Sequence, residues 1–350
     1  MTAAGWRDAG NLLCIRLDYL GDVLMMTPAI RALKRSRPGR RITLMTSPGG
    51  AAVARYIADV DAVISYPAPW LKSSSPHPPD VDLAMARTLR AGGFDGAVIF
   101  TTYSQSALPA AMLCYLAGIP LRLAHCRENP YQLLTDWIPD PEPHLQVRHE
   151  VRRQLDLVEK AGCRTEDERL SMQIPPDDLA AVCHRLESLG IDGDRPWIVL
   201  HPGATAPSRR YPPQRWREVA QLLAERLACP LVFTGSQQES MLVDEIRDGI
   251  PLAISLAGKL GLGELAALIS MAPVLVANNT GPAHIGAAVG TPVVDLYALT
   301  NPQHTPWQVP SRVLFHDVPC RNCYKSVCPE GHHACLANVA PARVADAAIE

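Results

Sequence analysis

The chain has 350 residues, of which 47% are apolar and 19% are charged, and its 33 Lys and Arg residues nearly balance 35 Asp and Glu residues, for a net charge of -2. This composition excludes collagen, coiled coils and wholesale disorder, and the absence of a basic excess argues against a general nucleic-acid-binding protein. The length predicts roughly two domains.

The beginning of the sequence gives no sign of an export signal, because Arg7 and Asp8 precede any apolar run. The longest uncharged apolar segment, residues 107–121, is shorter than the roughly 20 residues of a membrane span and contains two prolines. We therefore expect a cytoplasmic protein whose scattered cysteines are reduced.

In the first half, short apolar runs alternate with helical patterns. The runs predict strands at residues 12–17, 42–46, 62–66 and 96–101, and a helix over residues 23–37. This alternation is typical of a parallel sheet with right-handed crossovers. The irregular segment 67–79 is expected to be a flexible loop, with a mobile lid over a ligand cleft as the alternative.

The second half repeats the alternation after a break. A charged helical stretch, residues 147–161, is followed by an irregular acidic segment and a short helix that ends at Gly190. We expect the linker near residues 165–195 and divide the chain into domains of residues 1–175 and 176–350. In the second domain, strands are predicted at residues 197–200, 230–234, 274–277, 293–297 and 312–315, with helices at 213–227 and 263–270. Two such α/β domains in tandem predict a ligand cleft between them, lined by the loops that follow the strands.

The first motif that indicates chemistry, RLDYLGDV, follows the first predicted strand. Gly21 permits a tight turn and the close approach of a ligand. Asp22 lies at the start of the next helix, where its carboxylate is able to accept a proton from a substrate hydroxyl. The alternative is that Asp22 or Asp18 only caps the helix.

The second motif, HPGATAPSRRYPP, predicts an anion site after a strand of the second domain. The amides and hydroxyls of Thr205 and Ser208, with the permanent charges of Arg209 and Arg210, are able to hold a diphosphate without a metal. The alternative is a proline-rich connection with solvated arginines.

The third motif, VANNTGPAHIGAA, predicts a strand that ends at a helix start. Asn279, Thr280 and Gly281 lie at this junction, and Pro282 fits the first helical turn. A helix start offers free amides and a positive dipole end to an anion. Neither a P-loop nor a GxGxxG motif after the first strand is found, which argues against P-loop chemistry and against a nicotinamide-dependent dehydrogenase.

Together these motifs resemble glycosyltransferase family 9, the ADP-heptose:lipopolysaccharide heptosyltransferases. The segments that match are GDVLMMTPAIRAL, HPGA-x₄-RRYPPQRW and NNTGPAHIGAAVGTPVV, in this order along the chain. The resemblance implies the GT-B fold, in which an N-terminal acceptor domain and a C-terminal donor domain, both Rossmann-like with parallel sheets, face each other across a cleft. It also implies an inverting, metal-independent transfer of heptose or a related sugar from an ADP-sugar to a hydroxyl of a glycolipid, a lipopolysaccharide core or another saccharide.

The resemblance also implies roles for single residues. Asp22 matches the catalytic base, and we place Asp18 and Gly21 on the acceptor side. Glu239 matches a ribose ligand, and Lys259 with Leu260 matches the adenine side. With the second motif, the expected donor site comprises Thr205, Ser208, Arg209, Arg210, Glu239, Lys259, Leu260, Asn279, Thr280, Gly281 and His284.

One departure from the family pattern concerns the donor sugar. Many members have Asp where this chain has Asn279, so that a negative charge expected near the sugar is absent here. The alternatives are therefore another sugar nucleotide, a small-molecule acceptor, or a nucleotide-sugar-binding protein without turnover.

A cysteine cluster comprises Cys320, Cys323, Cys328 and Cys335, with two histidines before the last cysteine. Its spacing is compatible with a structural Zn²⁺ site, with reduced thiols packed on the C-terminal domain, or with disulfides. We assign it no catalytic role, and we expect that catalysis requires no cofactor.

A run of cations without an intervening acid begins at Arg31 and ends at Arg41. A solvated helix end is the simpler interpretation, and attraction to a phosphorylated acceptor or to an anionic lipid surface at the inner face of the cytoplasmic membrane is the alternative. The run consists of Arg31, Lys34, Arg35, Arg37, Arg40 and Arg41.

Overall fold

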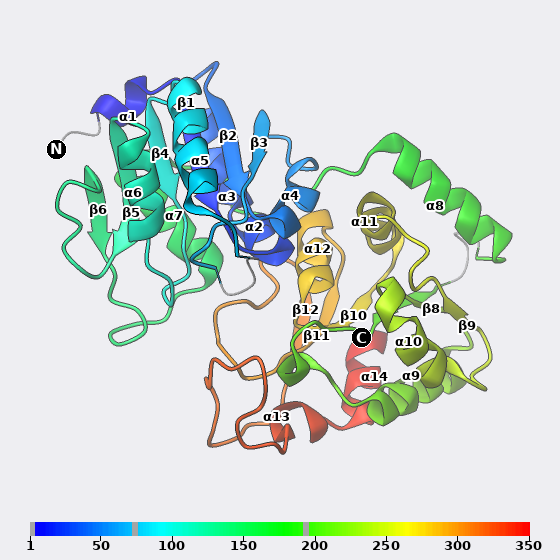
Figure 1. Cartoon of the computed structure of the whole chain (residues 1–350). Coiled ribbons are helices and arrows are strands. Elements are labelled where there is room, and N and C mark those ends of the chain that lie inside the picture. Colours follow the sequence, from blue (N-terminus) through cyan, green and yellow to red (C-terminus); the bar gives the residue numbers. More distant parts are fainter. Residues whose placement is uncertain (1–3, 72–75, 192–195) are drawn as a thin grey trace. The chain divides into compact units, whose positions relative to one another are not determined.

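Two six-stranded sheets, in which every pair of neighbouring strands is parallel, organise the chain (Figure 1). The computed structural model describes residues 4–71, 76–191 and 196–350. Each sheet belongs to one of two compact units, Met1–Ser171 and Met172–Glu350. Residues 72–75 of the segment that we considered as a lid lie outside the described residues. None of the helices in the described ranges has the length and the apolar character needed to cross a bilayer.

The first sheet has the strand order β3-β2-β1-β4-β5-β6. Its strands are β1 (Asn11–Arg16), β2 (Arg41–Thr46), β3 (Ala62–Ser65), β4 (Gly96–Ile99), β5 (Leu121–Cys126) and β6 (Asp136–Pro139). The helices of this unit are α1 (Ala4–Asp8), α2 (Leu20–Met25), α3 (Thr27–Arg35), α4 (Pro48–Ala54), α5 (Pro79–Ala91), α6 (Leu108–Leu116) and α7 (Glu150–Lys160). The central strands β1 and β4 are almost entirely buried, as expected for a parallel sheet covered on both faces.

The helix expected over residues 23–37 is two helices, α2 and α3, which meet at Met26. Pro28 has no backbone N–H to donate to the carbonyl of Leu24 one turn earlier. That carbonyl instead accepts a hydrogen bond from Thr27 Oγ1 at 2.7 Å. The chain therefore turns between α2 and α3, and α2 remains a short helix directly after the loop that follows β1.

The second sheet has the strand order β12-β11-β10-β7-β8-β9. Its strands are β7 (Ile198–His201), β8 (Leu231–Phe233), β9 (Ala253–Ser255), β10 (Leu275–Asn278), β11 (Val293–Leu296) and β12 (Ser311–Leu314). The helices are α8 (Pro176–Ser188), η1 (Pro207–Arg209), α9 (Pro213–Leu227), η2 (Gln237–Glu239), α10 (Ser240–Arg247), α11 (Leu262–Met271), α12 (Gly281–Val289), α13 (Ala334–Ala337) and α14 (Pro341–Ile349). Helix α8, which we expected within the linker, packs on α11 of this unit.

Each unit has its own apolar core. In the first unit, Leu13 of β1 and Ile99 of β4 belong to one buried cluster with Leu113 of α6. In the second unit, Trp216 of α9 is fully buried and contacts the ring of Tyr211 edge-on at 5.9 Å. Burial of one such large side chain contributes roughly 1.5–3 kcal/mol. These cores hold the strand ends, and therefore the loops that follow them, in place.

Candidate functional site

The loop after β1 is organised by Arg16, the last residue of the strand, which is fully buried. Its guanidinium contacts three carboxylates. The Nε atom lies 2.7 Å from Asp18 Oδ2, and Nη2 lies 3.1 Å from Asp22 Oδ1. The Nη1 atom lies 2.7 Å from Oε1 of Glu150, a fully buried residue at the start of α7. One buried cation therefore connects both predicted aspartates with a glutamate that the motif does not include.

Asp22 lies at the third residue of α2, whereas the N-cap position is Tyr19. Neither aspartate is therefore the N-cap residue, and the simple capping interpretation is wrong. The side chain of Asp22 is 21% exposed, against 15% for Asp18. Asp22 is thus the more accessible of the two carboxylates that contact Arg16.

The backbone at Asp18 is fixed by α4, which packs on α2. The hydroxyl of Ser47, the N-cap of α4, donates to the carbonyl of Asp18 at 2.5 Å. Gly50 allows this close approach, because a Cβ atom there would lie 2.0 Å from Thr46 Oγ1 and 3.1 Å from the Asp18 carbonyl oxygen. The position of the aspartates therefore depends on the end of β2 as well as on their own motif.

The electrostatic surroundings of Asp18 differ from those of an ordinary surface aspartate. Burial raises its pKa to about 6, and the charges of Asp22 and Glu150 act in the same direction. Arg16 and a hydrogen bond from Gln105 Nε2 to Asp18 Oδ1, at 2.5 Å, oppose this rise. Asp18 therefore changes its charge near pH 6.

In the second unit, the loop after β7 is fixed by Asn278, the last residue of β10, which is fully buried. Its Nδ2 donates to the carbonyl of Pro202 at 2.7 Å, and its Oδ1 accepts from the backbone N–H of Tyr211 at 3.2 Å. One amide therefore holds both ends of the predicted phosphate loop. Our sequence reasoning selected the neighbouring Asn279 and missed this residue.

Ser208 does not present the donors that we expected for an anion. Its backbone N–H donates to the carbonyl of Ser326 at 3.0 Å, and its hydroxyl donates to the carbonyl of Lys325 at 2.9 Å. The side chain is buried as a consequence. Ser208 therefore fixes η1 against the segment that contains the cysteine cluster.

The two arginines of this loop differ in their contacts. Arg210 Nε donates to the carbonyl of Ala204 at 2.8 Å, and its Nη2 donates to that of Thr205 at 3.3 Å. Arg209 is half-buried, and its Nη1 lies 3.5 Å from the carbonyl oxygen of Asn279. Arg210 closes its own loop, whereas Arg209 extends to the junction of β10 and α12. Thr205, whose carbonyl accepts from Arg210, is exposed.

Glu239 lies directly beside the loop after β7. Its Oε2 accepts from the backbone N–H and the hydroxyl of Ser236 at 2.7 and 2.9 Å. A Cβ atom on Gly203 would lie 2.1 Å from Glu239 Oε1, so that any other residue there would displace the Glu239 carboxylate. Burial lowers the pKa of the adjacent His201 to about 4, although the charge of Glu239 raises it. His201 is therefore neutral at pH 7.

The remaining expected donor residues also follow strand ends. Lys259 is exposed after β9, and its Nζ donates to the carbonyl of Ser255 at 3.0 Å, while Leu260 is half-buried. Thr280 is the N-cap of α12, which begins at Gly281, and His284 is buried in the same helix. The strand order β10-β7-β8-β9 places the carboxyl ends of the four strands at one sheet edge. The structure thus brings the expected donor residues to the same edge of the second sheet.

A carboxyl group that we did not predict lies beside Asn279. Asp295 is fully buried in β11, the strand next to β10. Burial raises its pKa well above the ordinary value, and the Arg209 charge and the Asn279 amide oppose this rise. Because burial favours the neutral form of this carboxyl group, the expected absence of a negative charge near the donor sugar stays a prediction. The signal in the sequence is an aspartate within the apolar run VVDLYA.

Comparison with known proteins identifies the family. The model of glycosyltransferase family 9 (heptosyltransferase) matches residues 83–334. The chain belongs to this family. Lipooligosaccharide heptosyltransferase 2 of Haemophilus influenzae is 26% identical to it over 320 residues, which cover 85% of both chains. Lipopolysaccharide heptosyltransferase 2 of Escherichia coli K12 is 24% identical over 351 residues, covering 95% of this chain and 96% of the relative.

Solved structures of the family share the fold. The glycosyltransferase family 9 protein of Veillonella parvula superposes with a TM-score of 0.78 at 21% identity, covering 97% of this chain and 96% of that one. The Escherichia coli ADP-heptose lps heptosyltransferase II gives a TM-score of 0.74 at 23% identity, covering 96% of both chains. The predicted GT-B fold is thereby confirmed, and family 9 membership makes the chain a glycosyltransferase.

The cysteine cluster of this family 9 chain lines a small cavity of about 20 Å³, together with His332 and His333. All ten cysteines are free thiols in the structure, and Cys320 Sγ lies 3.9 Å from His332 Nε2. Among the described residues, no three or more His, Cys, Asp or Glu side chains are arranged to hold a metal ion. The cluster thus consists of free thiols here, and a structural Zn²⁺ at this position stays a prediction.

The cationic run does not form one charged face. Arg40 is 1% exposed and donates to the carbonyl oxygens of Trp6, Ala9 and Leu33. Arg31 is 4% exposed and donates to two carbonyl oxygens of the segment after α7. For these two arginines, both the solvated helix end and the lipid-binding interpretation are wrong, because their charges hold the backbone of the first unit together.

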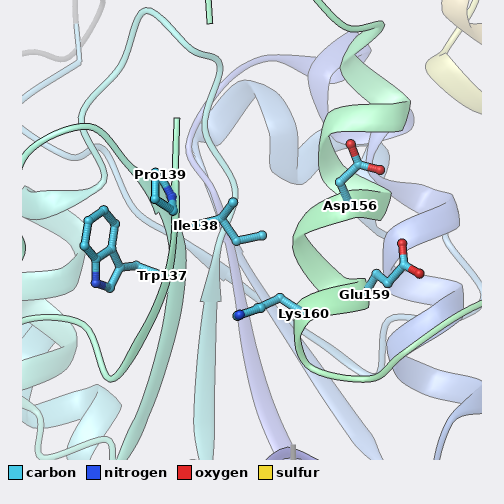
Figure 2. A pocket seen from close by; sticks show the side chains of 6 residues that line it. All are labelled: Trp137, Ile138, Pro139, Asp156, Glu159 and Lys160. Carbon is cyan, nitrogen blue, oxygen red and sulfur yellow. The ribbon is translucent and has the colours of Figure 1, made fainter. Parts of the chain in front are cut away.

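A pocket of about 350 Å³ lies between β6 and α7 (Figure 2). Trp137, Ile138 and Pro139 line it from the strand. Two acidic side chains and a lysine line it from the helix, and one of the acids, Asp156, forms ion pairs with Arg148 and Arg152. None of the residues that we predicted for the reaction lines this pocket, and we assign it no role in sugar transfer.

Proposed function

We propose that this family 9 enzyme transfers a heptose, or a related sugar, from an ADP-sugar to a hydroxyl group of a lipopolysaccharide core or another saccharide acceptor. The names of its relatives support the sugar and the acceptor, since heptosyltransferases acting on lipopolysaccharide and lipooligosaccharide match most of the chain. The anion-binding character of the second sheet edge supports a nucleoside diphosphate donor.

The observation that most supports catalysis is the placement of Asp22. It is a partly accessible carboxylate, 21% exposed, at the carboxyl end of a parallel strand, and its Oδ1 is oriented by the buried Arg16. In the proposed reaction, Asp22 removes the proton from the acceptor hydroxyl while the hydroxyl oxygen attacks the anomeric carbon. The bond from that carbon to the β-phosphate oxygen breaks, and ADP leaves with the electron pair. A single displacement of this kind inverts the anomeric configuration.

The leaving diphosphate needs positive charge, and the second unit offers it at the edge of its sheet. Arg209 lies at the β10–α12 junction, and α12 begins there with Thr280 as its N-cap. A guanidinium forms short charge-assisted bonds with phosphate, and the helix start adds free amides. We propose that these groups stabilise departing ADP without a divalent cation. Arg210 contributes indirectly, because it fixes the loop from which Arg209 extends.

The test is the variant Asp22→Asn, assayed with ADP-heptose and a lipopolysaccharide-core oligosaccharide as acceptor. Loss of a general base lowers turnover by roughly two to four decades, while ADP affinity, measured by calorimetry, stays near that of the wild type. The matched control is Asp156→Asn, which removes a carboxylate that pairs with Arg148 and Arg152. Turnover of Asp22→Asn near the wild-type rate, or a product of retained configuration by NMR, would refute the proposed mechanism.

A further inference from the structure

The contacts of Arg16 pose a chemical problem for a base at Asp22. An arginine beside a single carboxylate lowers the pKa of that carboxylate, typically by about 1–3 units, and thereby makes it a weaker base. General bases work best when their pKa lies near the working pH. If Asp22 were the sole partner of the buried Arg16, this contact would orient the base and also weaken it.

Arg16, however, contacts two further carboxylates. Asp18 and Glu150 each lie 2.7 Å from a guanidinium nitrogen, closer than Asp22 at 3.1 Å. One positive charge therefore faces three negative charges. The negative charges of Asp18 and Glu150 act on Asp22 in the direction opposite to that of Arg16.

A second buried arginine, Arg153, lies near this cluster, and its charge also acts on Glu150. Arg153, on the same helix as Glu150, forms ion pairs with Asp140 and Glu142 at 2.8 and 2.6 Å. Glu150 also accepts from Gln154 Nε2 at 2.6 Å. The neutral amide of Gln105 likewise donates to Asp18, through its Nε2 at 2.5 Å.

We propose that Asp18 is a second functional carboxylate of the transfer reaction: by sharing Arg16 with Asp22, it leaves Asp22 both oriented and basic. This inference rests on the proposed function, in which Asp22 is the base. Asp18 acts through Arg16 and is therefore a positioning residue. When Asp18 binds a proton, its negative charge no longer opposes the charge of Arg16. Asp22 then takes up the proton of the acceptor hydroxyl less readily.

This arrangement gives the enzyme a specific pH dependence. Because burial raises the pKa of Asp18 to about 6, Asp18 becomes neutral as the pH falls through this value. Turnover should therefore decline near pH 6, above the ordinary range in which an aspartate that is paired with an arginine titrates. The decline reports Asp18 and not the protonation of Asp22 itself.

The test compares Asp18→Asn with the wild type between pH 5 and pH 8.5, using ADP-heptose and the core oligosaccharide. At pH 8 the variant should be slower by roughly three- to tenfold, because the charge that opposes Arg16 is missing. At pH 5 the two rates should converge, since Asp18 of the wild type is then neutral as well. Asp18→Glu should restore the rate at pH 8, and ADP affinity should be unchanged in both variants.

A second variant keeps the proposal testable if Asp18→Asn does not fold. Gln105→Leu removes the hydrogen bond that lowers the pKa of Asp18, so the decline in turnover should move to higher pH. Asp156→Asn should leave the wild-type profile unchanged. An unaltered profile in both Asp18→Asn and Gln105→Leu would overturn the inference, and so would a rate ratio for Asp18→Asn that is constant with pH. High turnover in Asp22→Asn would instead overturn the proposed function.

Discussion

Arg209 and Arg210 are adjacent in the sequence but have different surroundings. The guanidinium of Arg210 donates to two carbonyl oxygens of its own loop, whereas that of Arg209 lies at the β10–α12 junction. We predict that Arg209→Ala weakens ADP binding by roughly 10- to 100-fold, as expected for loss of a charge-assisted phosphate contact. Arg210→Ala should weaken it less and mainly lower the melting temperature. Calorimetric titration of ADP into both variants checks this, and equal affinities for ADP would contradict it.

Asp295 should make stability depend on pH. Because its folded-state pKa is raised well above that of the unfolded chain, the folded protein holds this proton more tightly. Its contribution to stability is complete below pH 4 and is lost as the pH rises. Relative to Asp295→Asn, the free energy of unfolding of the wild type should fall by up to about 1.4 kcal/mol per pH unit above pH 4. Urea titrations of both proteins at pH 5 and pH 8 measure this, and parallel pH curves would contradict it.

The sequence predicted candidate site residues that lie within a motif. It did not predict residues that contact the site from a distant segment of the chain. Asp22 and Arg209 became candidates because a strand end and a turn precede each of them in the sequence. Glu150 and Asn278 did not, since their partners are 134 and 67–76 positions away along the chain. Spacing within a motif contains no information about contacts of that range.

At the scale of elements, the loop between β7 and α9 depends on β10. Asn278→Ala removes the amide that holds both ends of this loop and leaves a buried carbonyl and a buried N–H without their partners. We predict a loss of roughly 2–3 kcal/mol of stability together with weaker ADP binding. Asn11→Ala serves as the control, because it removes two exposed bonds of the first unit. Thermal unfolding with and without ADP tests the prediction, and similar effects of the two variants would contradict it.

The central strands that the sequence predicted are those with a continuous run of apolar residues. The runs that form β1, β4, β7 and β10 are apolar except at their ends, as expected for buried central strands. Three strands were missed: β5 has Arg122 and His125 within its apolar run, whereas β6 and β9 are short edge strands with mostly half-buried side chains and little apolar signal. Prediction of the break between α2 and α3 required knowledge of which group donates to the carbonyl of Leu24.

At the scale of the whole molecule, turnover should not require a divalent cation. We predict that a short exposure to EDTA leaves the rate of ADP release unchanged, because Arg209 and the start of α12 supply the positive charge. A structural Zn²⁺ in the cysteine cluster would be removed slowly and would lower the melting temperature before the rate. Unfolding followed in parallel separates the two effects. An immediate loss of activity that Mg²⁺ restores would contradict the prediction.

The phosphate loop of the donor unit is completed by residues far downstream of it. Ser208 donates to the carbonyls of Lys325 and Ser326, and the Tyr211 hydroxyl donates to that of Val339 at 2.8 Å. During synthesis, a chain emerges from the ribosome with its N-terminal part first. A nascent chain that already contains every residue of the phosphate loop therefore still lacks the carbonyls that fix it. In the proposed function, the donor site is complete only when translation has passed Val339, and we expect proteins from messages truncated before this codon to bind ADP-sugar more weakly.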